Sequence, residues 1–529
     1  MAIYGLEEPG VSHDTLDVTC EEDPDDDIYY LKHEPLLTGD QRRIFNQLIK
    51  HIDANEGGLY TIDAPGGSGK TFLCNLILAY ARKQKKIAIA TALSGIAATL
   101  MTKGTTFHRR FGVPVDCTEY STSSMKPTSN EAMTIKHAVI IFVDEVSIMK
   151  WNQLQVLDRL LRLIMPTDKP MGGKLVVLLH DFRQLLPVVP GGSRAHIICE
   201  AVINSHIWNN FTTFYLKTNM RVMNSRKLDD PAKADKLDEY AKWLLSTGDG
   251  TVETALQGTD IVEIKPNMCA KDIEDLNNKV YNEFSTNYND PSYLKDRAIM
   301  SCTNDVIQKC NEEMINKIPG QALVCESVHS FLDDDDYLFH DTGPLTRINS
   351  SGLAPHKLVL KVGACIILIR NMSIQDGHCN GTCYIIIGLS KYLIHARRIN
   401  AGGESGTILP ADDIFIPRIP MMSKESDYPV LFKRLQFPIL VSYYLTINRA
   451  QGQSLKRAGL YLPKNVFTHG HLYAGLSRCG DPDHVHICTN QEEFNHVSHL
   501  LDPSKKYTKN IVYKEILKPK KLYGDIPKS

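Results

Sequence analysis

Several signatures of metal, redox and membrane proteins are missing from this sequence. None of its 13 cysteines belongs to a Cys-x-x-C pair, the spacing typical of structural zinc and dithiol sites. The closest grouping, Cys379 and Cys383 in HCNGTC, has no second ligand pair nearby, so we expect reduced, structural thiols. No apolar run approaches the thickness of a bilayer, and the first residues lack the features of a signal peptide. These absences predict a soluble, intracellular protein.

An excess of either charge is also missing. The formal net charge is -2, so the overall electrostatic field is weak and any nucleic-acid partner must be held in a local groove. The 529 residues, 43% of them hydrophobic, are enough for about three or four domains with real cores. No internal repeat of fixed period is present.

Residues 58–73, GLYTIDAPGGSGKTFL, have the strand-loop-helix pattern of a phosphate-binding loop. In such a loop, backbone amides and a helix N-terminus face the anion, a lysine neutralises the terminal phosphates, and a hydroxyl ligates magnesium. Lys70 and Thr71 are the expected lysine and hydroxyl. Ala64 stands where the pattern has its first glycine, so both a working loop and a decayed one fit the pattern.

Polar side chains follow two later strand patterns. The run AVIIFVDE ends in Asp144 and Glu145, where Asp144 can join the Mg²⁺ shell and Glu145 can polarise an attacking water. The run HDFRQLLPV places Gln184 after the next strand, where its amide can sense the terminal phosphate or position water.

The pattern of apolar runs changes along the chain. Runs that alternate with helical patterns indicate a parallel sheet covered on both faces, and they lie at 86–92, 138–145 and 174–181. From about residue 321 to 436, short glycine-punctuated segments predict a small β-barrel insertion. Residues 1–34 are acidic and 501–529 are lysine-rich, so we expect a flexible N-terminal segment and a solvated tail.

Seven segments in order carry a family resemblance: DAPGGSGKT, SGIAATL with GTTFH, VDEVS, DFRQLLPV, LKTNMRV, TINRAQGQSL and HGHLYAGLSR. The set resembles the motifs of superfamily one, group B DNA helicases, most closely the petite-integration-frequency (PIF) helicases and the helicase part of Helitron transposons. The resemblance covers about residues 36–492. It implies an α/β fold with two RecA-like P-loop NTPase domains, ATP and Mg²⁺ between them, and single-stranded or forked DNA as partner.

The resemblance also implies residue roles. The expected catalytic residues are Lys70, Asp144, Glu145, Gln184, Arg221 and Arg478. Both arginines would reach from the second domain as arginine fingers. The expected nucleotide contacts are Gln41, which would read the adenine, and Pro65, Gly66, Gly67, Ser68, Gly69, Lys70, Thr71 and Gly452. Thr71 and Asp144 would hold Mg²⁺. The expected DNA contacts are Thr91, Ser94, Thr106, His108, Thr446 and Gln453.

The implied domain limits are 35–195 for the first RecA-like domain, 196–320 plus 437–500 for the second, and 321–436 for an SH3-like β insertion. Residues 108–134 are too many for a simple connection, so we expect a small pin-like insertion beside the DNA fork.

Some positions depart from the family pattern. Besides Ala64, they are His180, His471 and Gly475. Every charged catalytic position is present, which favours a working site. His484 and His486 fall after the last motif with no paired-tyrosine helix behind them, so a nuclease site is not expected.

The predicted function is an ATP-dependent DNA helicase that moves 5′ to 3′ and is a monomer on DNA. We expect it in the nucleus, in repair, recombination, or telomere or mobile-element maintenance, without membrane contact. Two alternatives stay open. One is a catalytically weak Helitron-derived remnant that binds single-stranded DNA without unwinding, and the other is a translocase that strips proteins from DNA. DNA-stimulated ATP hydrolysis separates the first from a helicase, and strand displacement separates the second.

Overall fold

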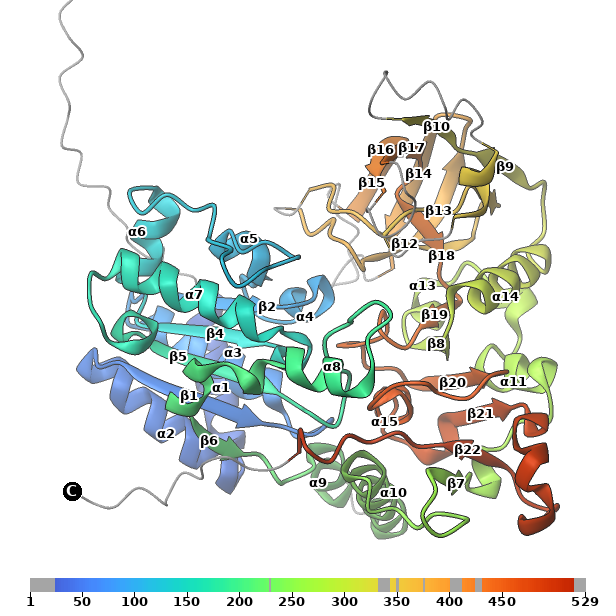
Figure 1. Ribbon diagram of the computed structural model, residues 1–529, viewed down its shortest axis with the longest axis horizontal. Coiled ribbons are helices and arrows are strands. Elements are labelled where there is room, and N and C mark those ends of the chain that lie inside the picture. Colours follow the sequence, from blue (N-terminus) through green and yellow to red (C-terminus); the bar gives the residue numbers. More distant parts are fainter. Residues whose placement is uncertain are drawn as a thin grey trace, which may run out of the picture.

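The computed structural model describes residues 24–227, 230–331, 343–348, 352–373, 376–399, 412–423 and 431–517. Its elements form two domains with parallel sheets and one insertion with antiparallel sheets. In Figure 1 the first domain lies on the left, the second at the lower right and the insertion at the upper right.

A six-stranded sheet of order β3-β2-β4-β5-β1-β6 carries the first domain, and all its strand pairs are parallel. Its strands are β1 (Gly58–Asp63), β2 (Ala88–Ala92), β3 (Thr105–Thr106), β4 (Ile140–Asp144), β5 (Leu175–His180) and β6 (Thr212–Tyr215). The strands expected at 58–64, 86–92, 138–145 and 174–181 are therefore present within two residues at each end.

Helices cover both faces of this sheet (Figure 1). They are α1 (Pro24–His33), α2 (Gly39–Ala54), α3 (Lys70–Lys83), α4 (Gly95–Thr99), α5 (Phe107–Phe111), α6 (Asn130–His137), α7 (Trp151–Ile164) and α8 (Arg194–Glu200). Along β4, Ile140 and Phe142 pack into the core beneath α2 and α3, whereas Ile141 and Val143 pack into the core beneath α5 to α7. The alternation follows from the two-residue period of a strand and explains why the run is apolar throughout.

The second domain has a four-stranded parallel sheet of order β19-β8-β20-β21. Its strands are β8 (Arg297–Ser301), β19 (Tyr444–Thr446), β20 (Arg457–Leu462) and β21 (Val485–Thr489). The helices are α9 (Met220–Lys227), α10 (Pro231–Asp249), α11 (Ile273–Val280), α12 (Phe284–Asn287), α13 (Pro291–Leu294), α14 (Asn304–Asn316) and α15 (His471–Leu476).

The insertion consists of antiparallel sheets of order β15-β14-β13-β12-β18 and β10-β17-β16, with a separate pair β11-β9. The strands are β9 (Leu323–Glu326), β10 (Val328–Phe331), β11 (Lys357–Leu360), β12 (Cys365–Leu368), β13 (Cys383–Leu389), β14 (Leu393–Arg398), β15 (Asp413–Pro417), β16 (Ile419–Met422), β17 (Phe432–Gln436) and β18 (Ile439–Val441). It therefore runs slightly past the expected limit at 436.

Short 3-10 helices complete the connections. They are η2 (Glu34–Leu36), η3 (Val146–Ile148), η4 (Pro170–Gly173), η5 (Val202–Asn204), η6 (His206–Asn210), η7 (Pro266–Met268), η8 (Pro344–Arg347), η11 (Pro482–His484) and η12 (Gln491–Leu500).

Two features differ from the expected domain limits. Strand β6 pairs with β1, so the first domain continues past residue 195; β6 is short and only partly buried, which leaves little strand signal in its sequence. Between α5 and α6 the described chain forms a loop without regular elements, and its role as a pin-like insertion stays a prediction. That loop is tied to α7, where Gln153 Nε2 donates to Val115 O at 3.0 Å.

Both terminal segments are more ordered than expected. Within the acidic segment, residues Pro24–His33 form α1, where Asp26 pairs with Arg82 of α3 at 3.8 Å; residues 1–23 lie outside the described part. At the other end, β22 (Tyr507–Lys509) pairs antiparallel with β7 (Ile261–Glu263). Tyr513 and Ile516 are buried in the core of the first domain. Apolar residues between the lysines thus anchor the segment up to residue 517.

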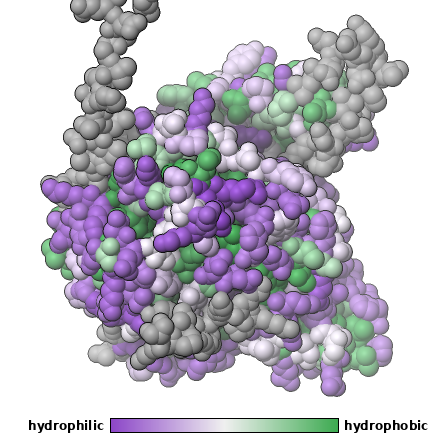
Figure 2. Space-filling view, turned by 60° about the vertical axis from the view of Figure 1, so that its left-hand side comes forward, coloured by the Kyte–Doolittle hydropathy of each residue, from purple (hydrophilic) through white to green (hydrophobic). Residues whose placement is uncertain are grey.

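Within the described ranges, every helix is too short or too polar to cross a membrane. Figure 2 shows a mainly hydrophilic face with apolar residues in scattered positions.

Candidate functional site: a cavity between the two domains

The loop between β1 and α3 has the backbone of a phosphate-binding loop. Gly67 and Gly69 adopt φ values of +84° and +78°, a region that strongly favours glycine. Helix α3 begins at Lys70, so its N-terminal amides point toward the loop, where an anion binds favourably.

Ala64 fits its position without backbone strain. It is not among the residues with positive φ, its N–H donates to His180 O at 3.0 Å, and its methyl group is buried in the core beneath α2 and α3. The glycine of the general pattern is therefore not needed at this position for conformational reasons.

Lys70 lies between the two predicted carboxylates. Its Nζ is 2.6 Å from Asp144 Oδ1 and 3.8 Å from Glu145 Oε1. Burial disfavours the ammonium, but these carboxylates outweigh burial, and the pKa of Lys70 lies above its ordinary value. Lys70 is therefore a cation at neutral pH, as binding of phosphates requires.

Glu145 has three properties of a functional carboxylate. It adopts φ +58° although it is not a glycine, and such strain clusters at active sites. Its Oε2 is buried without a hydrogen-bond partner. Burial raises the pKa of its carboxyl, opposed by Lys70. A buried carboxylate with one free oxygen and a raised pKa is suited to accept a proton from water.

The second domain brings two arginines to this loop. Arg221 lies at the start of α9, where Met220 N donates to Gly67 O at 2.9 Å. Arg478 follows α15 and is buried; its Nε donates to Ala474 O at 2.8 Å and its Nη2 to Gln184 Oε1 at 3.2 Å. Gln184 of the first domain thus directly contacts the second domain.

All six predicted catalytic residues line one cavity of about 220 Å³ between the domains. They are Lys70, Asp144, Glu145, Gln184, Arg221 and Arg478. The loop from Pro65 to Thr71 and Gly452 line it as well. Thr71, Asp144 and Glu145 offer oxygen atoms, the ligands that Mg²⁺ prefers. The unpartnered Oε2 of Glu145 could accept a hydrogen bond from a water bound to the ion.

Gln41 is not open to this cavity. It is 1% exposed, its Oε1 accepts from Thr38 N at 3.1 Å, and its Nε2 donates to Ser68 O at 3.1 Å. These contacts place Gln41 behind the loop, so reading of an adenine requires a change in its contacts and stays a prediction.

A larger groove of about 670 Å³ lies between the first domain, the insertion and the second domain. Thr106 and Gln453, two of the predicted DNA contacts, line it. Gly452, Gln453 and Ser454 line both this groove and the nucleotide cavity. Leu100 of the first domain also lines both, so the two sites meet between Leu100 and this turn of the second domain.

The other predicted DNA contacts lie off the groove walls. Thr91 is fully buried and donates to Phe142 O at 2.8 Å, so it stabilises the sheet and the prediction of a DNA contact is wrong for it. Ser94 caps α4, and Thr446 accepts from Arg449 N. His108 lies against Val113 O, and burial lowers its pKa.

The departures from the family pattern are accommodated by packing. His180 is buried against Phe182 and Trp208, and burial lowers its pKa to about 3, so it is neutral. His471 is buried with a pKa lowered to about 4 and packs against Phe467. Gly475 leaves room for Leu460, whose Cδ2 lies 2.9 Å from where a Cβ would be.

No group of three or more His, Cys, Asp or Glu residues in the described chain is arranged to hold a metal. Cys379 and Cys383 are free thiols, and burial raises the pKa of both. His486 lies on β21 with its Nδ1 buried and unpartnered, and His484 lies 3.5 Å from Asp481.

Sequence reasoning missed residues that line the groove and one residue that lies near the nucleotide cavity without lining it. Asn371, Thr382 and Arg398 of the insertion line the groove, but no spacing pattern marks them. Arg183 lies inside the quoted run HDFRQLLPV, yet its partners Asp63 and Asp249 are 120 and 66 positions away, so the sequence alone gives no sign of them.

The fold and this cavity match the pattern of a P-loop NTPase, with the predicted catalytic residues divided between two domains. A family model described as PIF1-like helicase matches residues 36–258, and one described as DNA helicase Pif1, 2B domain, matches residues 345–389. Together they match just over half of the chain. The chain belongs to the PIF1-like helicase family.

Among curated proteins, the ATP-dependent DNA helicase Pif1 of Campylobacter jejuni is 25% identical over 436 residues, covering 80% of this chain and 88% of that protein. The Psychrobacter Pif1 and the PIF1 of Danio rerio are each 24% identical. The matches cover 78% of this chain in both cases, but only 63% and 55% of those two relatives.

Two solved structures have a similar fold. Pif1 helicase from Candida albicans has a TM-score of 0.58 at 20% identity, covering 91% of this chain and 97% of that one. Bacteroides Pif1 in complex with ADP-AlF3 and ssDNA has the same TM-score and identity, covering 86% and 92%. The two parallel-sheet domains are therefore RecA-like, as expected.

Proposed function

We propose that this protein is an ATP-dependent DNA helicase in which ATP is hydrolysed between the RecA-like domains. The observation that carries the proposal is the single cavity lined by Lys70 and Glu145 of the first domain and by Arg478 of the second. Hydrolysis needs groups from both domains at one phosphate, so it depends on domain closure.

In this proposal Lys70 binds the terminal phosphates and Glu145 takes a proton from the attacking water. Arg221 and Arg478 stabilise charge on the transferred phosphoryl group, and Gln184 connects the water to Arg478. Thr71 and Asp144 would hold Mg²⁺, which would neutralise negative charge on the phosphates. The roles of all these residues are proposed from the family motifs and from their shared cavity.

Single-stranded DNA is proposed to lie in the larger groove. The groove is lined by hydroxyl, amide and basic side chains from three parts of the chain, among them Thr106, Gln453 and Arg398, which suits contact with one strand. The turn at Gly452 and Gln453 lines both sites and offers a direct path from nucleotide state to DNA contact.

The test is ATP hydrolysis by purified protein with and without single-stranded DNA at fixed low salt, since phosphate contacts are salt-sensitive. We expect severalfold stimulation by DNA that Lys70→Ala abolishes and that chelation of Mg²⁺ removes. Background hydrolysis in the presence of bound DNA contradicts the proposal and favours the Helitron-derived binding remnant.

Strand displacement decides between a helicase and a protein-stripping translocase. Duplexes with a 5′ or a 3′ single-stranded tail give the direction, for which the motif resemblance supports 5′ to 3′. Displacement of neither duplex, with intact DNA-stimulated hydrolysis, favours the translocase.

The remaining proposals rest on the resemblance alone. They are monomeric action on DNA, a role in repair, recombination, or telomere or mobile-element maintenance, and residence in the nucleus. One solved structure of similar fold concerns DNA unwinding at forked dsDNA by two coordinating Pif1 helicases. Light scattering of the protein with a fork substrate is therefore the direct test of the monomer.

A further inference from the structure

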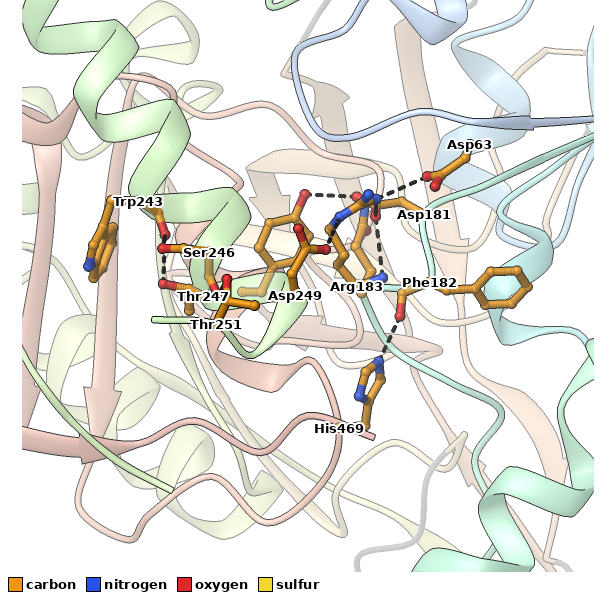
Figure 3. A network of polar contacts seen from close by, with 12 residues as sticks. Asp63, Asp181, Phe182, Arg183, Trp243, Ser246, Thr247, Asp249, Thr251 and His469 are labelled. Carbon is orange, nitrogen blue, oxygen red and sulfur yellow. Dashed lines mark hydrogen bonds and ion pairs between the residues drawn. The ribbon is translucent and has the colours of Figure 1, made fainter. Parts of the chain in front are cut away.

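Arg183 lies where carboxylates from both domains converge (Figure 3). Its Nη1 is 2.9 Å from Asp63 Oδ1 and 2.9 Å from Asp181 Oδ1. Asp63 ends β1 and Asp181 follows β5, both in the first domain. Its Nε is 2.8 Å from Asp249 Oδ1 at the end of α10 in the second domain. Burial opposes the charge, but the carboxylates outweigh it, and the pKa of Arg183 lies above its ordinary value.

Asp249 occupies a position that its own helix disfavours. It is the last residue of α10, where the negative end of the helix dipole repels a carboxylate. Its side chain is 43% exposed, so water is available to it as an alternative partner. The ion pair with Arg183 accounts for a carboxylate at this point.

Asp181 connects this network to the nucleotide cavity. Its Oδ2 accepts from Gln184 Nε2 at 3.1 Å and from Tyr473 OH of the second domain at 2.9 Å. Gln184 Oε1 accepts from Arg478 Nη2 at 3.2 Å. The carboxylate that Arg183 holds through one oxygen therefore holds Gln184 through the other.

The backbone around Arg183 fits closely against the second domain. A Cβ on Gly248 of α10 would lie 2.9 Å from both Arg183 Cβ and Tyr473 Cδ2, and a Cβ on Gly470 would lie 2.6 Å from Arg183 O. Leu185 is buried in the core of the second domain. Separation of the domains must therefore break the polar and the packing contacts together.

We propose that Arg183 is a positioning residue that couples docking of α10 to the placement of Gln184 and Arg478. With Asp249 docked, Arg183 is held from both domains, and Asp181 keeps Gln184 against Arg478. When the domains part, Arg183 loses Asp249 and Asp181 loses Tyr473, so Gln184 is released. ATP turnover then depends on domain contact as well as on nucleotide binding. The inference rests on the proposed ATPase function.

The test is Asp249→Asn, because this side chain is half-exposed and does not line the nucleotide cavity. We expect kcat of DNA-stimulated ATP hydrolysis to fall about 3- to 10-fold, the range of a coupling contact, with KM for ATP within about 2-fold. Asp249→Glu retains the charge and should restore most of the rate. Glu239→Gln is the matched control. Glu239 also lies on α10, but its 2.8 Å ion pair with Lys265 stays within the second domain.

Domain contact is measured independently by energy transfer between fluorophores at the exposed residues Tyr120 and Lys464. With a non-hydrolysable ATP analogue, Asp249→Asn should populate a more separated state that Glu239→Gln does not. An unchanged transfer efficiency or an unchanged kcat overturns the coupling, as does a rate loss that parallels a lower melting temperature and resists Asp249→Glu. If the wild type lacks DNA-stimulated hydrolysis, the proposed function fails, and energy transfer alone decides whether Arg183 and Asp249 hold the domains together.

Discussion

At the scale of single residues, the phosphate-binding loop separates glycines that the backbone requires from one that it does not. Gly67 and Gly69 have positive φ, whereas Ala64 does not. A Cβ on Gly69 would also lie 2.5 Å from Gln41 Nε2, whereas the methyl group of Ala64 already fills space in the core. Ala64 therefore differs from the general pattern in how it packs in the core and not in its backbone conformation.

Ala64→Gly should leave ATP affinity unchanged within about 2-fold and lower the free energy of unfolding by about 1 kcal/mol, because a buried methyl group is lost and the unfolded chain gains freedom. Gly69→Ala is the contrasting variant. Its left-handed backbone costs about 1–2 kcal/mol for alanine, and the contact with Gln41 displaces the loop, so nucleotide binding should weaken. Titration with a fluorescent ATP analogue measures the nucleotide affinity of both variants, and guanidinium unfolding measures their stability. A severalfold gain in affinity for Ala64→Gly would mean that the alanine impairs the loop.

At the scale of elements, the segment from residue 510 to 517 connects the two domains. Asn510 donates to Thr247 O of α10 at 2.8 Å, and Tyr513 N donates to His469 Nδ1 at 2.8 Å. This bond requires the proton on His469 Nε2, which donates to Phe182 O at 2.7 Å. Burial lowers the pKa of His469 to about 4, so the ring is neutral and keeps this tautomer at physiological pH. The segment thus passes beside the Arg183 contact.

Tyr513→Ala should lower the free energy of unfolding by about 3 kcal/mol, the usual cost of removing a buried aromatic side chain. Its ring is 5% exposed and packs in the core of the first domain. Tyr120→Ala, at 87% exposure, should change stability by less than about 0.5 kcal/mol. Guanidinium unfolding followed by fluorescence compares the two. Equal midpoints for Tyr513→Ala and wild type would show that the segment is not anchored there.

At the scale of the whole molecule, the sequence predicts what local patterns carry. Strands β1, β2, β4 and β5 of the first domain follow from apolar runs. Lys70 follows from the loop between β1 and α3, and Asp144 and Glu145 follow from their place at the end of β4. Because the carboxyl ends of parallel strands meet at one edge, these residues share a cavity. Two features could not be predicted in this way. The burial of Thr91 depends on the direction of its side chain, and the contact of Arg183 with Asp249 depends on how the domains dock.

The groove itself is a property of the assembled molecule, since three separate parts of the chain line it. Arg398 at the end of β14 lines it and donates to Asp376 O, whereas the adjacent Arg397 does not line it and is paired with Asp413 at 2.6 and 3.0 Å. Arg398→Ala should weaken binding of single-stranded DNA and reduce the slope of log affinity against log salt by about one. Arg397→Ala is the matched control and should leave that slope unchanged, because its charge is already neutralised by Asp413. Fluorescence anisotropy at several salt concentrations measures both slopes, and equal slopes for the two variants would place the DNA outside this groove.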